Sequence, residues 1–223
     1  MARRVRRERR FRRLPPQAGA ARPRRRIRRD AEVPGKLVAP MPHAPDPRRP
    51  FAIREMDRAV DRPGVAALDT SFRTTSVFDV VVTPRRIELV ERALTAPLVK
   101  RYPIEDAFAP WATWETGFVA DDGGICGFAA VEHEVWHRRL VLWHFYVAPQ
   151  RRREGIGRAL LARVEQHGRQ VGARRVWLET SNVNAPGIAA YARLGYTLCG
   201  ADATLYEATP AAAETALYLS KPL

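Results

Sequence analysis

The chain has 223 residues, of which 46% are hydrophobic, so it is long enough for one packed domain with an extension, or for two small domains. It contains no run of eighteen apolar residues, and no apolar stretch follows its Arg-rich start, so we expect neither a transmembrane helix nor a secretory signal. Two cysteines, Cys126 and Cys199, are too few for a disulfide framework or a zinc site. We expect both to be small core residues of a cytoplasmic protein.

The formal net charge of +14 is concentrated in one segment. Residues 1–50 contain 17 basic and four acidic residues, a net charge of +13, which leaves +1 for the rest of the chain. Arg and Pro dominate this segment without helical or strand periodicity, which predicts a disordered basic extension. Three interpretations stay open: binding to nucleic acid or another anionic surface, a solvated segment without a function, or upstream sequence translated from a wrongly assigned start, with Met41 as a plausible true start.

From residue 51 onward the sequence has the periodicities of a folded domain, which we place at residues 51–223. Two turn sequences, 83–86 and 121–124, predict hairpins between the strands that flank them. Residues 61–64 have the composition of a turn, and residues 92–113 are interrupted by prolines and are expected to be irregular. The predicted strands are 51–56, 77–82, 87–91, 117–120, 125–135, 139–147, 175–179, 196–199 and 215–219.

Helical periodicity is present in two segments, and a further helix is expected to begin at 65–68. The first segment covers residues 155–171 and ends at Gly172, and the second covers residues 186–194, with Gly195 after its end. Strands followed by strand, helix, strand, helix and strand predict an α/β domain built on a mixed sheet. The residues expected on one face of the first helix are Ile156, Leu160, Val164, His167 and Val171.

Between residues 147 and 160 a strand leads into a basic, glycine-containing loop that opens the first helix. A helix N-terminus presents unpaired N–H groups and a partial positive charge, and glycines let a phosphate approach the backbone closely. The pattern therefore predicts a pyrophosphate-binding loop, with a basic helix cap that binds no ligand as the alternative. The residues expected to take part are Arg151, Arg152, Arg153, Glu154, Gly155, Ile156, Gly157 and Arg158.

Two segments match the signatures of a known family. Residues 152–157, Arg-Arg-Glu-Gly-Ile-Gly, resemble the acetyl-CoA signature R/Q-x-x-G-x-G/A of the GNAT acetyltransferases. Residues 184–196 resemble the second signature of that family, N-x6-Y-x3-G-[FY], after an intervening helix and strand. Further segments, 67–72, 136–140 and 177–186, resemble streptothricin (nourseothricin) acetyltransferases, and the similarity covers nearly all of the predicted domain.

The resemblance implies a GNAT fold, in which helices flank a mixed, mostly antiparallel central sheet. It implies acetyl-CoA as co-substrate, no metal, and direct transfer of acetyl to a primary amine of a small molecule. A streptothricin-type antibiotic is the leading acceptor, which would give resistance by inactivation, and another amine metabolite is the alternative. No membrane partner is expected, nucleic acid is expected only through the extension, and the choice between monomer and homodimer stays open.

The resemblance also assigns roles to individual residues. Tyr191 matches the acid that protonates the thiolate, although helix packing is an alternative role for it. Asn184 matches a polar position beside the cofactor and is also suited to cap a helix. The backbone of Phe145, Tyr146 and Val147 is expected to pair with the pantetheine arm.

The acceptor amine must lose a proton before it attacks, and two residues are candidate bases. His144 has an ordinary pKa near neutral, and Glu179 could act through water. Either could instead be a satisfied polar residue. Where streptothricin acetyltransferases carry adjacent acidic residues, this chain has Trp143 and His144, so the acidic candidates are Glu132, Glu134 and Glu179.

Two other motifs point to different chemistry and are weaker. Residues 133–137 spell H-E-x-x-H, which binds zinc only on a helix, whereas a strand would separate the two histidines by about 13 Å. Gly155 and Gly157 could begin a dinucleotide-binding motif, but its third glycine position is Leu160. A non-catalytic acyl-CoA-binding module with a nucleic-acid-binding extension is the alternative from another functional class.

Overall fold

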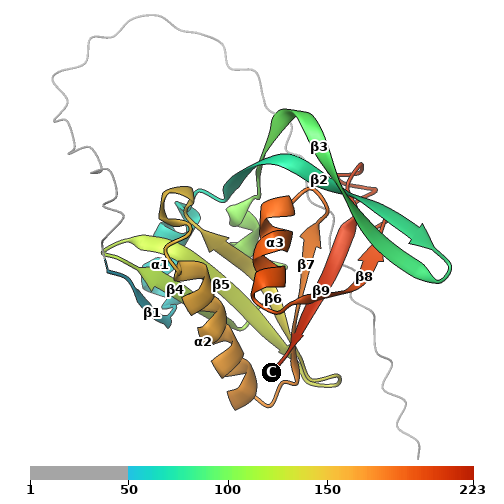
Figure 1. Cartoon of the computed structure of the whole chain (residues 1–223). Helices are drawn as coiled ribbons and strands as arrows, with labels where there is room; N and C mark the ends of the chain where they lie inside the picture. Colours follow the sequence, from blue (N-terminus) through green and yellow to red (C-terminus); the bar gives the residue numbers. More distant parts are fainter. Residues whose placement is uncertain (1–49) are drawn as a thin grey trace, which may run out of the picture.

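The computed structural model describes residues 50–223, so the predicted extension lies outside the described residues. Seven strands form one sheet in the order β1-β4-β5-β6-β7-β9-β8, and β2 pairs with β3 in a separate ribbon (Figure 1). Only β6 and β7 are parallel within that sheet, which confirms the mixed, mostly antiparallel arrangement. The strands of the sheet are β1 (Ala52–Glu55), β4 (Thr116–Asp121), β5 (Ile125–Glu134), β6 (Arg139–Val147), β7 (Arg175–Ser181), β8 (Thr197–Asp202) and β9 (Ala216–Pro222).

Helices cover both faces of the sheet. On one face, α2 (Ile156–Gln170) and α3 (Ala185–Arg193) pack against apolar side chains of the central strands (Figure 1). On the opposite face lie α1 (Arg58–Ala66) and the 3₁₀ helix η1 (Ile104–Phe108). Among residues 50–223, no helix is long and apolar enough to cross a membrane.

α2 packs on the sheet through its predicted face over the first part of its length, where Ile156, Leu160 and Val164 are buried. The buried face then continues through Gly168 rather than through His167 and Val171, which are half-buried and exposed. A Cβ at Gly168 would lie 2.6 Å from Cδ1 of Leu223, so the glycine lets the C-terminal residue pack against the helix.

The parallel pairing of β6 and β7 is short. It begins at Arg139 and Arg175 and ends at Leu142 and Leu178, although β6 runs on to Val147. At the same point β6 contains a bulge, because Ala130 of β5 pairs with His144 while Val131 pairs with Leu142. Trp143 is the additional residue, and beyond it β6 pairs with β5 alone. A bulge bends a strand and increases its twist, which separates β6 from β7 at this end.

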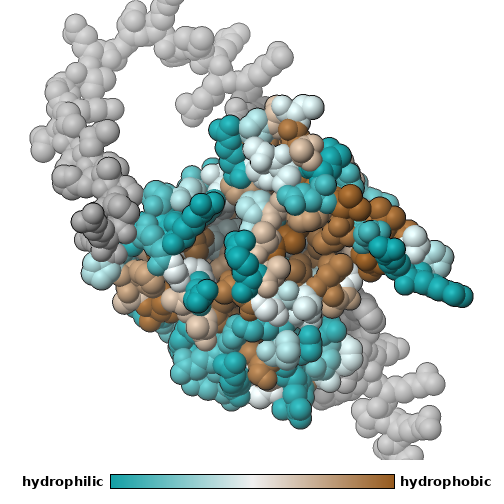
Figure 2. Space-filling model, viewed as in Figure 1, coloured by the Kyte–Doolittle hydropathy of each residue, from teal (hydrophilic) through white to brown (hydrophobic). Residues whose placement is uncertain are grey.

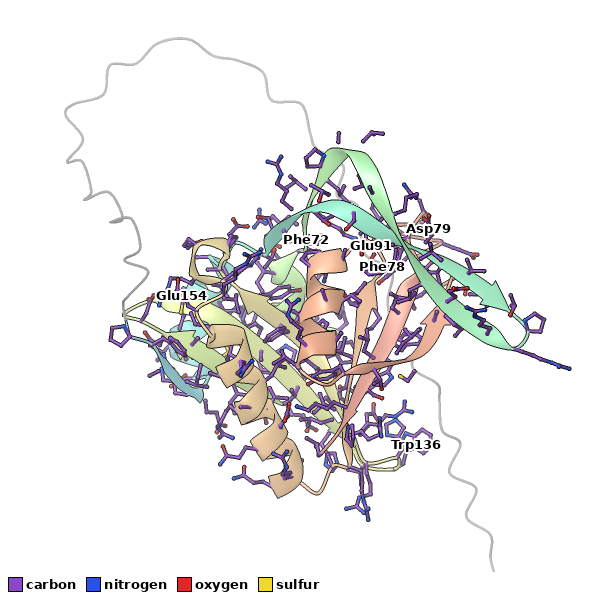
Figure 3. All side chains as sticks on the ribbon, viewed as in Figure 1. Phe72, Phe78, Asp79, Glu91, Trp136 and Glu154 are labelled. Carbon is purple, nitrogen blue, oxygen red and sulfur yellow. The ribbon has the colours of Figure 1, made fainter. Side chains whose placement is uncertain are left out.

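β2 (Ser71–Thr83) and β3 (Arg86–Arg101) form a ribbon that passes α3, with Phe72 and Phe78 of β2 beside that helix (Figure 3). The hairpin at 83–86 is confirmed, but the expectation that residues 92–113 are irregular is wrong as far as Arg101. Pairing skips from Ala93 to Leu98 on β3, and Pro97 lies in this gap, where its missing N–H costs no ladder bond. Beyond the sheet the ribbon has a hydrophobic surface (Figure 2), with Val81, Val82, Ile87 and Val90 exposed.

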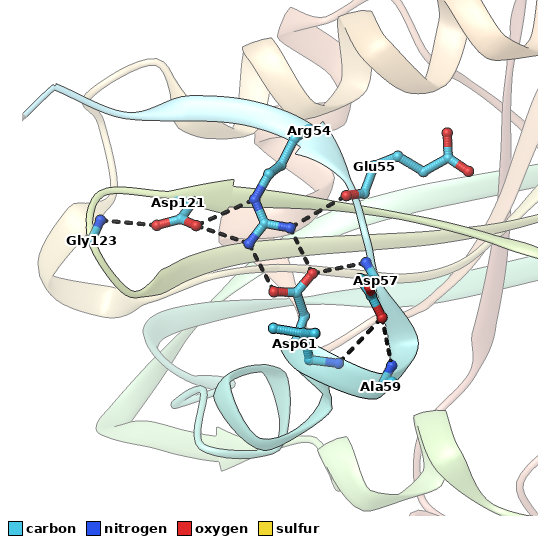
Figure 4. Close-up of polar contacts among 8 residues, drawn as sticks. Arg54, Glu55, Asp57, Ala59, Asp61, Asp121 and Gly123 are labelled. Carbon is cyan, nitrogen blue, oxygen red and sulfur yellow. Dashed lines mark hydrogen bonds and ion pairs between the residues drawn. The ribbon is translucent and has the colours of Figure 1, made fainter.

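α1 ends where a helix was expected to begin. Asp57 caps its N-terminus by accepting hydrogen bonds from the N–H groups of Ala59 (2.9 Å) and Val60 (3.2 Å), so residues 61–64 are helical rather than a turn. Arg54 of β1 donates to Asp61 of α1 at 2.6 and 2.7 Å and to Asp121 of β4 at 2.8 Å (Figure 4). This pairing fixes α1 on the edge of the sheet.

The two cysteines differ in their surroundings. Cys126 of β5 is buried, as expected. Cys199 is exposed, so the expectation that it is a core residue is wrong. It lies on β8, the last strand of the sheet, where the packing of neighbouring strands covers less of each residue.

We predict that Asp61→Asn lowers the free energy of unfolding by about 1–2 kcal/mol, because the Asp61 side chain is buried whereas half-exposed Arg54 keeps access to water. The Arg54 guanidinium lowers the pKa of Asp61, so this contribution is present above about pH 4 and is lost as the pH falls further. Urea unfolding at pH 7 and at pH 3 measures the difference. Asp79→Asn, which breaks the exposed pair with Arg92 on the ribbon, is the control and should leave the midpoint nearly unchanged. Equal effects of the two substitutions would contradict the prediction.

Candidate active site

The loop between β6 and α2 presents the N-terminus of α2 to solvent. After the short 3₁₀ helix η2 (Pro149–Arg151), the backbone takes positive φ at Arg153 (67°) and at Gly155 (87°), which is the N-cap of α2. No atom lies within 4 Å of the position of a Cβ on Gly155, so the space above the helix terminus is open. Gly157 has a different role, since its Cβ would lie 3.3 Å from the Phe145 ring, and it lets α2 pack closely on β6.

The arginines of this loop divide into two groups. Arg151 is buried and pairs with Asp122 and, at 2.7 Å, with Glu154, which is labelled beside the loop in Figure 3. Arg152 donates to the carbonyl of Val147 at 2.9 Å and to that of Ser71 at 2.6 Å, so it ties the loop to the start of the ribbon. Arg153 and Arg158 have exposed side chains at the helix start. Only these last two are placed to reach an anion there without breaking a contact.

The free edge of β6 lies beside this loop. Phe145 and Val147 pack on the face that α2 and α3 cover, whereas Tyr146 packs on the other face. Because β7 has already diverged, the backbone of this part of β6 has a strand partner on one side only. The surface is hollowed between the start of α2 and α3 (Figure 2). An extended ligand could therefore follow the free strand edge from the loop into the sheet.

Tyr191 of α3 borders this gap. Its ring centroid lies 5.9 Å from that of Phe145 on β6 and 5.6 Å from that of Tyr196. Burial raises the pKa of Tyr191 well above its ordinary value, so the phenol is protonated at neutral pH. Asn184 acts as the N-cap of α3, accepting from the N–H of Gly187 at 3.1 Å and donating to Thr180 at 3.0 Å. Its amide is thus engaged in holding the helix start.

His144 lies in a buried environment that moves its pKa away from the ordinary near-neutral value. The side chain points to the face opposite α2, with its ring 6.3 Å from that of Phe128 and 6.0 Å from that of Tyr146. Within residues 50–223, its Nδ1 is buried and has no hydrogen-bond partner. Burial lowers the pKa of His144 to about 4, so the ring is neutral and only weakly basic at pH 7.

Burial raises the pKa values of Tyr191 and Tyr146, and the charge of Glu179 on β7 raises them further. Glu179 as a whole residue is exposed, but the protein atoms around its carboxylate desolvate it and raise the pKa of Glu179 above its ordinary value. Tyr206, from the connection between β8 and β9, donates a hydrogen bond to it. The other acidic candidates are less available, since Glu132 accepts from Trp143 at 2.8 Å and from Thr113 at 2.7 Å, and Glu134 lies at the end of β5.

The sequence motifs account for only part of this site. Tyr206, Lys100 and Glu214 were not expected, and they approach Glu179 from segments that lie 27 or more residues away in the chain. His133 and Glu134 are on β5 and His137 is in the turn that follows, so the H-E-x-x-H segment is not helical. Among residues 50–223, no group of three His, Cys, Asp or Glu side chains is arranged to hold a metal ion.

Comparison with known proteins identifies relatives of this chain in sequence and in structure. Residues 87–196 match the model of the acetyltransferase (GNAT) family. The chain is 40% identical over 174 residues to the streptothricin acetyltransferase of Streptomyces lavendulae, which covers 74% of this chain and 92% of that protein. A crystal structure of nourseothricin acetyltransferase is 41% identical, covers 77% of this chain and 98% of its own, and superposes with a TM-score of 0.70.

The fold is shared more widely. A Bacillus anthracis protein proposed to be a streptothricin acetyltransferase, solved in complex with acetyl coenzyme A, is 22% identical. It covers 78% of this chain and all of its own, with a TM-score of 0.67. This likeness shows that the two proteins share a fold, and that protein was solved with acetyl coenzyme A bound. The chain belongs to the GNAT family of acetyltransferases, together with the streptothricin acetyltransferases.

Proposed function

We propose that this acetyltransferase inactivates a streptothricin-type antibiotic by transferring acetyl from acetyl-CoA to one of its primary amines. The observation that carries the proposal is the 40% identity to the Streptomyces lavendulae enzyme over 92% of that enzyme.

The described residues fit acetyl-CoA. The open space above Gly155 and the helix N-terminus would receive the pyrophosphate, with Arg153 and Arg158 as exposed cations nearby. The unpaired backbone edge of residues 145–147 would hold the pantetheine arm. Arg151 and Glu154 support the loop through their mutual pairing rather than by contact with the cofactor. Asn184 supports the start of α3 in the same indirect way.

The chemistry needs one group that accepts a proton and one that donates a proton. We assign the first role to Glu179, because its carboxylate has a raised pKa and lies near Tyr191, whereas the pKa of His144 has fallen to about 4. The neutral amine then attacks the thioester carbonyl, a C–N bond forms and the C–S bond breaks. Tyr191, protonated at neutral pH, donates its proton to the departing thiolate and regains one as the acetylated nitrogen loses its second proton to become an amide.

One feature favours a different amine as the second candidate. Trp143 and His144 occupy the bulge of β6, and the Trp143 indole engages Glu132. An acidic pair at this position would attract a cationic acceptor. In this chain, Glu179 is the acidic residue that would attract it instead. Another amine antibiotic or metabolite is therefore the alternative acceptor.

Incubation of the full chain with acetyl-CoA and streptothricin, aminoglycosides, polyamines or β-lysine tests the proposal. We expect a monoacetylated streptothricin by mass spectrometry, and lowered drug sensitivity in cells that express the protein. Acetylation of another amine with none of streptothricin would select the second candidate instead.

We predict that Tyr191→Phe lowers kcat by about 10²–10⁴-fold and leaves the Kd for acetyl-CoA nearly unchanged, because only the proton donor is lost while the ring keeps its packing. Stopped-flow turnover and calorimetry measure the two quantities. Tyr196→Phe is the matched control, since Tyr196 packs against Tyr191 and its buried hydroxyl has no hydrogen-bond partner within residues 50–223. Near-normal turnover of Tyr191→Phe, with chemistry rate-limiting, would leave Tyr191 with a packing role only.

We predict that Gly155→Val raises the KM for acetyl-CoA at least about tenfold, because a side chain at φ 87° strains the loop and fills the space for the phosphate. Gly172→Val is the control, since Gly172 has a similar φ of 77° but lies at the far end of α2. Both glycine variants should lower the free energy of unfolding by about 1–2 kcal/mol, but Gly172→Val should keep the wild-type KM for acetyl-CoA. A raised KM in both variants would show that strain alone is responsible.

A further inference from the structure

The end of β7 joins two segments that are distant in sequence. The backbone carbonyl of Asn182 accepts from the N–H of Phe78 on the ribbon at 3.0 Å, and its side-chain amide donates to the carbonyl of Phe78 at 2.7 Å. The N–H of Asn182 donates to the carbonyl of Thr215, and its side-chain oxygen accepts from the N–H of Thr215, both at 2.9 Å. The ribbon and the β8–β9 connection, residues 203–215, are therefore both attached at Asn182, three residues beyond Glu179.

Glu214 is the second point of attachment of this connection. It accepts hydrogen bonds from Lys100 of β3 and from Ser181, which is almost fully buried at the end of β7. The Lys100 and Glu214 side chains are themselves only 21% and 17% exposed, so the pair is partly shielded from solvent. Partial shielding strengthens the influence of these charges on a neighbouring carboxylate.

Tyr206 is the third attachment, and it reaches Glu179 directly through its hydroxyl. The connection is thus held at Glu214 by the ribbon and at Tyr206 by the carboxylate that we assign as the base. Three long-range contacts converge on one strand end, and none of them touches the cofactor loop.

We propose that Tyr206, Glu214 and Lys100 are positioning residues that hold the β8–β9 connection against the end of β7 and thereby fix the Glu179 carboxylate at the acceptor side. The inference rests on the proposed function, because it takes Glu179 as the proton acceptor.

The charges around Glu179 act on it in opposite directions. Burial raises the pKa of Glu179, the Tyr206 hydrogen bond and the Lys100 charge lower it, and the Glu214 charge raises it. The remaining groups near the carboxylate are neutral phenols whose own pKa values are raised above the ordinary range, so they carry no charge at neutral pH. They are Tyr102, Tyr146, Tyr191 and Tyr218.

The test is the pH dependence of kcat/KM for the acceptor at saturating acetyl-CoA, whose acidic limb reports deprotonation of the base. Lys100→Met removes a cation and should move that limb to higher pH by about half a unit or more, and Glu214→Gln should move it to lower pH by a similar amount. Tyr206→Phe should move it to higher pH. The double variant Lys100→Met/Glu214→Gln should lie close to the wild type, because the two shifts cancel.

Arg101→Met and Glu207→Gln are the matched controls. Each removes an exposed charge one residue from a proposed positioning residue, and neither should shift the limb. Calorimetric binding of acetyl-CoA shows that each variant is folded, since the cofactor loop lies apart from these contacts. If Lys100→Met does not bind acetyl-CoA, Glu214→Gln and Tyr206→Phe still give a pair with opposite expected signs.

Titration of the Glu179 carboxyl by ¹³C NMR, assigned with Glu179→Gln, measures the same shifts without an acceptor. Opposite shifts for Lys100→Met and Glu214→Gln support the inference by either measurement. Shifts of the same sign, or none, overturn it and leave these residues with a structural role. Absence of acetylated product from the wild type would instead overturn the proposed function, and the NMR titration would still decide the inference.

Discussion

The site depends on the point at which β6 and β7 stop pairing. Four parallel residue pairs hold the two strands together, and the bulge at Trp143 then turns β6 away. Continued pairing would occupy the backbone edge of β6 and close the sheet, which would leave no path between its two faces. Divergence opens that path, with the glycine loop of α2 on one face and Glu179 on the other. Tyr191 is held at the boundary by its contact with Phe145.

Support for the open strands comes from elements outside the sheet. The ribbon is tied to the cofactor loop at Ser71 by Arg152, and to the β8–β9 connection at Lys100 by Glu214. Both attachments lie at the open end of the ribbon, where Ser71 pairs with Arg101 and Phe72 pairs with Lys100. α1 is fixed at the far edge of the sheet by Arg54, where it packs on the face opposite α2. The gap between β6 and β7 is thus bordered by segments that are held by hydrogen bonds and ion pairs, and these contacts limit closure of the gap.

Local sequence signals predicted the parts of the site that depend on neighbours along the chain. The loop at Gly155 and the buried face of α2 as far as Val164 are of this kind. A glycine that adopts a positive φ and the period of a helix can both be recognised from residues that are close together in the sequence. The start of α1 was missed because Pro63 and Gly64 suggested a turn, whereas the Asp57 cap and the Arg54 pairing favour a helix. The length of β3 was missed because Pro97 is tolerated in a gap of the ladder that only the fold reveals.

The residues around Glu179 could not be predicted in the same way. Lys100, Tyr206 and Glu214 come from three separate places in the sequence, and burial rather than residue type determines the low proton affinity of His144 and the raised affinity of Glu179. Tertiary packing creates these environments, and no spacing along the chain encodes them.

The segment that carries Tyr206 and Glu214 is a surface connection between two strands of the sheet, and it is distinct from every element that forms the cofactor loop. Connections of this kind tolerate insertions and substitutions better than strands and helices do. Substitutions in this connection therefore change the wall around Glu179 while the loop at Gly155 stays intact. The separation of the two faces lets one side of the site vary independently of the other.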